Sequence, residues 1–171
     1  MLTCRYMILG VAFGWGERKG LDVFIALSKF LDERFKIVLV GTNKQMDEML
    51  PDSIVSIHKT QNQKQLAKIY SAADIFVNPT REDNFPTVNL ESLACGTPVI
   101  TFRTGGSMEM LDDSCGKVAE NREIKALARE ITGICENKVY HRSNCVQRAE
   151  MFRQEKRLKE YLQLYSQESV D

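Results

Sequence analysis

Short apolar runs alternate along the chain with segments whose apolar residues recur at the spacing of an α-helix. The apolar runs predict buried strands at Tyr6–Ala12, Lys36–Val40, Ser53–Ile57, Asp74–Asn78 and Val99–Phe102, with a further short apolar piece at Gly116–Ala119. Helical spacing predicts helices at Leu21–Arg34, Asn43–Leu50, Gln65–Ala73, Pro86–Cys95, Ile124–Ile134 and, with a break near Phe152, His141–Tyr165. The alternation indicates βαβ units. We therefore expect a doubly wound α/β fold, with a parallel sheet of about six strands and helices on both faces.

The segment from Asn78 to Glu109 places a helix directly after a buried strand. Pro86 suits the first turn of that helix, because its fixed φ is helical and its missing N–H has no partner there. Gly96 ends the helix, and Pro98 prevents it from resuming. The N-terminus of the helix thus lies at the carboxyl end of a strand, where open α/β sheets bind their ligands.

The chemistry of this segment suits a ligand with hydroxyl groups on both sides of a diphosphate. Free N–H groups around Phe85, Thr87 and Val88 would attract a phosphate. Asp83 precedes the helix and Glu91 lies beyond its first turn, so a carboxylate would flank the diphosphate on each side. Carboxylates accept hydrogen bonds from hydroxyls rather than bind phosphate, which favours a nucleotide sugar. The alternative is that Glu91 is a solvated helix residue.

The Gly-rich loop Phe13–Gly20 offers a cation to the same site. Gly14-x-Gly16 begins a dinucleotide fingerprint, but Lys19 stands where the third glycine is required, and no acid follows the second strand. A P-loop would need Gly-Lys-Ser/Thr. Lys19 can instead reach a diphosphate, with a contribution of roughly 1.5–3 kcal/mol. The alternative is that Arg18 and Lys19 are an ordinary surface pair.

Composition narrows the class of protein. The chain of 171 residues predicts one domain. Lys+Arg and Asp+Glu both number 23, so the balance implies no basic face for nucleic acid. The five cysteines are scattered and form no C-x-x-C, which favours a reduced, cytoplasmic chain without a disulfide framework or zinc site. No apolar run approaches the roughly 18 residues of a membrane span, so we expect a soluble protein.

Three motifs together resemble the retaining glycosyltransferases of family 4. They are Asp83-x7-Glu91, the following Ser-Leu-Ala-Cys-Gly-Thr-Pro-Val-Ile, and Gly105-Gly106-x-x-Glu109. The resemblance runs from about Tyr6 to Tyr165 and is to the C-terminal, donor-binding half of the GT-B fold, which is Rossmann-like. Asn84 and Pro86 replace the glycines that usually flank the Phe of this motif, and Met108 replaces a Pro. These departures leave open whether Asp83 or Glu82 faces the sugar.

The resemblance implies transfer of a sugar, with retention, from a UDP- or GDP-sugar to a saccharide or lipid-linked acceptor in polysaccharide biosynthesis. It implies no cofactor and no metal. Lys19 matches the family's diphosphate-binding lysine, and Arg18 is the nearest substitute for an arginine of the family's loop. The implied catalytic residues are Lys19, Arg18, Asp83 and Glu91. The implied donor-binding residues are Gly14, Gly16, Lys19, Thr60, Gln61, Asp83, Asn84, Phe85, Pro86, Thr87, Val88 and Glu91, with the base held near Thr60 and Gln61.

We expect residues 1–171 to be a single donor-binding domain whose C-terminal helices span about 140–166. The N-terminal acceptor domain is expected to be absent, so the isolated domain would be inactive or weakly active. The full-length enzyme could associate peripherally with the inner face of the membrane. Two other functions use the same residues. One is a non-catalytic nucleotide-sugar binding module, and the other is a GT-B-type nucleotide-sugar epimerase.

Overall fold

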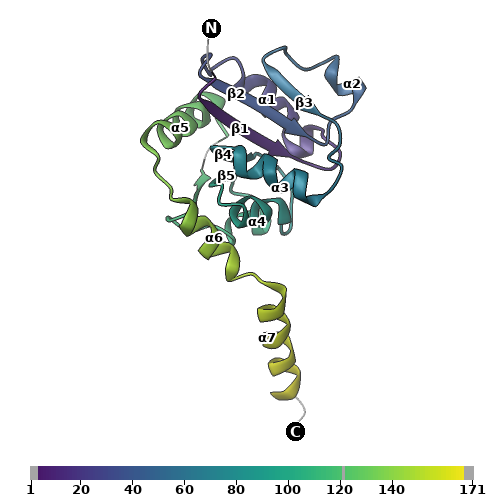
Figure 1. Cartoon of the computed structure of the whole chain (residues 1–171), viewed down its shortest axis with the longest axis vertical. Coiled ribbons are helices and arrows are strands. Elements are labelled where there is room, and N and C mark those ends of the chain that lie inside the picture. Colours follow the sequence, from purple (N-terminus) through teal and green to yellow (C-terminus); the bar gives the residue numbers. More distant parts are fainter. Residues whose placement is uncertain (1–3, 121, 168–171) are drawn as a thin grey trace.

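The computed structural model describes residues 4–120 and 122–167, which form an α/β domain around one twisted sheet (Figure 1). The sheet has six strands in the order β3-β2-β1-β4-β5-β6, and every neighbouring pair is parallel. The strands are β1 (Tyr6–Val11), β2 (Phe35–Val40), β3 (Ile54–Ile57), β4 (Ile75–Asn78), β5 (Val99–Phe102) and β6 (Gly116–Ala119). This confirms the predicted fold class, and the short apolar piece at Gly116 is the sixth strand.

Helices cover both faces of the sheet. The helices are η1 (Glu17–Lys19), α1 (Leu21–Leu27), α2 (Lys44–Asp47), α3 (Gln63–Ala72), α4 (Thr87–Ala94), η2 (Gly105–Met108), α5 (Ile124–Asn137), α6 (Arg142–Glu150) and α7 (Gln154–Gln167). Helix α1 contacts α5, whereas α4 contacts both α3 and α6. Successive strand residues point to opposite faces, so Ile8 joins the core under α1 and α5, while Leu9 joins the core under α3 and α4.

Helix α1 is shorter than predicted. The apolar spacing on which the prediction rested continues beyond the point where the helix ends. It stops at Leu27 instead of Arg34, and residues 28–34 form turns. The Asp32 carboxylate accepts hydrogen bonds from the backbone N–H and the guanidinium of Arg34. Such local side-chain bonds compete with a helix. Here they turn the chain into β2.

The break in the C-terminal helical segment is confirmed. Helix α6 ends at Glu150 and packs on α4, and α7 begins at Gln154 and projects away from the domain (Figure 1). The Phe152 ring lies in the break, with the guanidinium groups of Arg148 and Arg157 over it. None of the helices in the described ranges is long and apolar enough to cross a membrane.

Candidate functional site

The site lies at the carboxyl ends of β1 and β4, the two central strands. From β1 the chain proceeds to β2 and β3 on one side of the sheet, and from β4 it proceeds to β5 and β6 on the other. Connections diverge at this point and leave a crevice, which is the usual ligand site of such sheets. The loops after β1, β4 and β5 meet here.

A close contact between backbones joins the first two of these loops. Gly20 has a left-handed φ of 77°, and a Cβ on it would lie 2.6 Å from the carbonyl oxygen of Pro79. The backbone N–H of Arg81 donates to the carbonyl of Arg18 at 2.9 Å. The hydroxyl of Thr80 donates to the same carbonyl at 3.3 Å. The turn that carries Lys19 is therefore held against the loop that leads into α4.

The third loop packs on the second in the same way. A Cβ on Gly105 would lie 2.1 Å from the carbonyl oxygen of Asp83, and one on Gly106 would lie 2.2 Å from that of Asn84. The N–H of Gly106 donates to this Asn84 carbonyl at 3.0 Å. The two glycines of the sequence motif thus allow a neighbouring loop to approach and fix the backbone on which Asp83 sits.

Two of the predicted site residues meet directly. The Lys19 Nζ lies 2.6 Å from the Asp83 Oδ2, and their side chains are only 20% and 17% exposed. A half-desolvated ion pair of this kind interacts more strongly than one on the open surface. The neighbouring Glu82 is exposed, and its carbonyl accepts from Thr80. Of the two acids left open by the sequence, Asp83 is the one paired with Lys19.

Helix α4 begins one residue later than predicted. Pro86 is its N-cap, with a φ of −71° and a ψ of 99°, so the helix proper starts at Thr87. The carbonyl of Pro86 already accepts a bond from the N–H of Asn89 at 3.0 Å. The Pro86 side chain makes no capping hydrogen bond. The N–H groups of Thr87 and Val88 therefore remain predicted donors to an external acceptor.

Glu91 faces helix α3. The Tyr70 hydroxyl donates to its Oε2 at 3.1 Å. Burial, followed by the nearby Glu91 charge, raises the pKa of Tyr70 well above its usual range, so Tyr70 stays a donor. The two residues line a groove of about 330 Å³ between α3 and α4, together with Gln63, Leu66, Ala67, Ala94 and Cys95. One carboxylate oxygen thus has a protein partner, while the Glu91 side chain as a whole is exposed.

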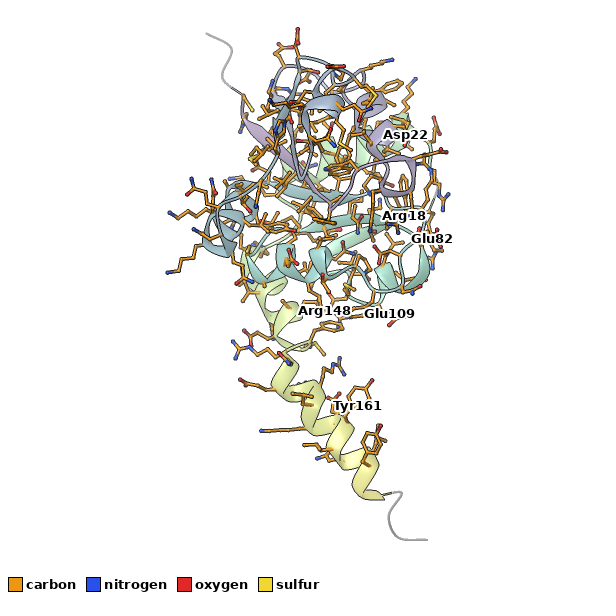
Figure 2. The ribbon with its side chains drawn as sticks, turned by 90° about the vertical axis from the view of Figure 1, so that its right-hand side faces the viewer. Arg18, Asp22, Glu82, Glu109, Arg148 and Tyr161 are labelled. Atoms are coloured by element: carbon orange, nitrogen blue, oxygen red, sulfur yellow. The ribbon has the colours of Figure 1, made fainter. Side chains whose placement is uncertain are left out.

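The remaining predicted residues lie around this crevice or farther along the same edge. Arg18 is exposed and lies on the same side of the domain as Glu82 (Figure 2). Gly14 and Gly16 flank Trp15, whose indole N–H donates to the Val40 carbonyl at 2.9 Å.

The residues predicted to lie near the base follow β3, at the outer edge of the sheet. In this loop the Gln61 N–H donates to the Gln65 side chain at 2.6 Å. Two strands, β1 and β2, separate β3 from β4. Thr60 and Gln61 therefore lie at the same carboxyl ends of the strands as Lys19 and Asp83, but farther toward the β3 side of the sheet.

Several residues that support the site were missed from the sequence. Asn78 donates to the Asn89 amide oxygen at 2.8 Å, and the Asn89 amide group donates to the Ser107 carbonyl at 3.3 Å. All three are buried and join β4, α4 and the loop after β5. The signal was available, because a polar residue inside an apolar strand must find a partner. The bidentate ion pair between Arg81 and Asp22 was also not predicted.

Helix α6 supports the last turn of the third loop from below. Arg148 donates to the carbonyls of Glu109 at 2.7 Å and Met110 at 3.0 Å (Figure 2). The Glu109 carboxylate of the sequence motif is exposed. Within residues 4–120 and 122–167, no group of three or more His, Cys, Asp and Glu side chains could hold a metal ion.

Comparison with known proteins gives consistent results. A family model described as "Glycosyl transferases group 1" matches residues 5–137. The chain is 35% identical to a GDP-mannose-dependent α-(1-6)-phosphatidylinositol dimannoside mannosyltransferase of Mycobacterium tuberculosis, over 51% of this chain and 23% of that protein. Among solved structures, sucrose-phosphate synthase from Thermosynechococcus elongatus has a TM-score of 0.79 and 25% identity, over 96% of this chain and 46% of that one.

A second structure, Anabaena HepE in complex with UDP-glucose, has a TM-score of 0.72 at 18% identity, over 88% of this chain and 44% of that one. This likeness concerns the fold alone. The chain spans less than half the length of each of these relatives. The match over most of its length and the shared fold show that the chain belongs to the glycosyl transferases group 1 family and has the fold of one half of a GT-B glycosyltransferase.

Proposed function

We propose that this domain binds the nucleotide-sugar donor of a retaining glycosyltransferase that needs no metal or other cofactor. The enzyme would transfer the sugar from a UDP- or GDP-sugar to a saccharide or lipid-linked acceptor during polysaccharide biosynthesis. One observation carries the proposal. Lys19 and Asp83, from two different loops, lie 2.6 Å apart in the central crevice, next to the N-terminus of α4.

The groups in the crevice suit the two ends of such a donor. The α4 N-terminus and the Lys19 ammonium together present positive charge to a diphosphate. As the bond to the sugar breaks, negative charge grows on the departing diphosphate, and these groups and Arg18 stabilise it. Asp83, once Lys19 turns to the phosphate, can accept a hydrogen bond from a sugar hydroxyl. Glu91 can accept from the ribose hydroxyls with the oxygen that Tyr70 leaves free.

The relatives support the same donor class and leave the base open. One is named as GDP-mannose-dependent, and another was solved with UDP-glucose. Gly14, Gly16, Thr60, Gln61, Asn84, Phe85, Pro86, Thr87 and Val88 complete the proposed donor site. The acceptor would be bound by the part of the relatives' length that this chain does not span.

Calorimetric titration with UDP, GDP, their sugars and the corresponding nucleosides tests the proposal. We expect one nucleoside diphosphate to bind with much higher affinity than its nucleoside. Lys19→Ala should remove most of that difference, about 1.5–3 kcal/mol, because only the diphosphate contacts the ammonium. Lys29→Ala removes an exposed charge after the far end of α1 and should change nothing. Equal binding of nucleotide and nucleoside by the unmutated protein would disprove the proposal.

A further inference from the structure

Arg81 links the two loops that carry Lys19 and Asp83. Its Nη1 and Nη2 donate to the two carboxylate oxygens of Asp22 at 2.8 and 2.6 Å. The Nη1 also donates to the backbone carbonyl of Glu17, and the backbone N–H of Arg81 donates to that of Arg18 at 2.9 Å. Arg81 therefore holds the backbone of the two residues directly before Lys19 and the first turn of α1 directly after it.

The turn around Lys19 needs such a support, because its own sequence is permissive. Gly14 and Gly16 precede it, and a Cβ on either would contact nothing within 4 Å. Gly20 follows it in a left-handed conformation that few other residues adopt. Arg81 and Asp83 belong to the same short loop, so one loop both fixes the backbone around Lys19 and pairs with its ammonium group.

The guanidinium is already committed to protein partners. The hydrogen bonds from Arg81 hold the pKa of the Asp22 carboxyl below its usual range, and Asp22 balances the charge of Arg81. Their side chains are 28% and 55% exposed, an environment in which an ion pair contributes little to stability. The value of the pair lies in its bidentate geometry, which fixes an orientation.

We propose that Arg81, through Asp22 and the Glu17 and Arg18 carbonyls, is a positioning residue that aims Lys19 at the N-terminus of α4. It supports the diphosphate site without touching the ligand. This inference rests on the proposed function of the crevice as a diphosphate site. It predicts that loss of the Arg81 fork weakens the phosphate contacts and leaves nucleoside contacts intact.

The test compares Arg81→Gln with Arg34→Gln in calorimetric titrations with UDP, GDP, uridine and guanosine. Arg34 makes a similar bidentate pair with Asp32, but it lies directly before β2, at the opposite (amino) ends of the strands. Arg81→Gln should weaken the nucleoside diphosphate about five- to twentyfold and leave the nucleoside unchanged, since part of the Lys19 contact depends on its position. Arg34→Gln should change neither affinity.

A Lys19→Ala background distinguishes the positioning of Lys19 by Arg81 from a direct contact between Arg81 and the ligand. There Arg81→Gln should have no further effect, because the group that it positions is gone. Asp22→Asn, which leaves Arg81 in place, should reproduce the loss and serves also where Arg81→Gln folds poorly. A full additional loss in the Lys19→Ala background, or wild-type affinity in both Arg81→Gln and Asp22→Asn, would overturn the inference. Failure of the unmutated protein to bind either nucleotide would overturn the proposed function and this inference with it.

Discussion

Replacing Asp83 with Asn removes the carboxylate that holds Lys19 while it keeps the shape of the side chain. The Lys19 Nζ contacts Asp83 Oδ2 at 2.6 Å, and the loop behind Asp83 is fixed by Gly105 and Gly106. A diphosphate would therefore have to share Lys19 with an adjacent negative charge that cannot withdraw by moving its backbone. The substitution should strengthen the binding of a free nucleoside diphosphate and weaken the hydrogen bond to a sugar hydroxyl.

The geometry sets the size of both effects. A phosphate on the free side of the Lys19 ammonium would lie about 5 Å from the Asp83 carboxylate, two hydrogen-bond lengths away. One like charge at that separation costs about 1 kcal/mol in water and about 3 kcal/mol at the effective dielectric near a protein surface. Asp83→Asn should thus tighten UDP or GDP about five- to hundredfold. A sugar hydroxyl would lose a charge-assisted hydrogen bond, roughly 1.5–3 kcal/mol, which offsets the gain for the nucleotide sugar.

Calorimetric titration of the unmutated protein and of Asp83→Asn, with a nucleoside diphosphate and with a nucleotide sugar, measures both changes in affinity. The expected result for Asp83→Asn is a tighter nucleoside diphosphate and a nucleotide sugar whose relative advantage falls tenfold or more. Glu82→Gln is the matched control, because it removes the neighbouring exposed carboxylate. If Asp83→Asn weakens the nucleoside diphosphate, or if Glu82→Gln gives the same pattern, the assignment of Asp83 is refuted.

Three further predictions concern Glu91, the loop that contains Gly105, and the buried Cys145 thiol. Glu91→Gln should weaken the ribonucleotide by roughly 1–3 kcal/mol and the 2′-deoxy nucleotide much less, and additive losses in calorimetry would contradict a ribose contact. Gly105→Ala should destabilise the fold by about 2 kcal/mol or more in urea unfolding, because its φ is 47° and its Cβ would meet Asp83, whereas Gly133→Ala, in α5 with nothing within 4 Å, should be neutral or stabilising. Burial raises the pKa of the Cys145 thiol from 9.0 to about 12, so it should react with iodoacetamide at pH 8 far more slowly than exposed Cys4, and its contribution to the free energy of unfolding should decline as pH rises from 9.0 to about 12.

The sheet and most helices could be predicted because their signal is local. Strand residues such as Ile8 and Leu9 are buried on opposite faces, so the sequence shows a continuous apolar run. The residues at which helices and strands end were harder to predict. Leu31 continues the helical spacing of α1, yet the helix ends at Leu27, and the bonds between Asp32 and Arg34 stabilise the turn that leads into β2. Spacing alone carries no information on this competition between side chain and backbone.

The site shows the same division between local and distant information. Motif and topology placed Lys19, Asp83 and the α4 N-terminus at one edge of the sheet, and the structure brings the first two into contact. Their separation depends on contacts between residues far apart in sequence, such as Gly20 with Pro79 and Arg81 with Asp22.

The direction of Glu91 could have been anticipated in part. Tyr70 lies in the helix predicted at Gln65–Ala73 and is buried, and a buried tyrosine hydroxyl needs a hydrogen-bond partner. Helix α3 packs against α4, so an acid one turn beyond the α4 N-terminus was a natural candidate for that partner. The partner matters for the chemistry as well. The Tyr70 hydroxyl partly orders the carboxylate, so under the proposed function its second oxygen would meet a ribose hydroxyl at a lower entropy cost than a free side chain.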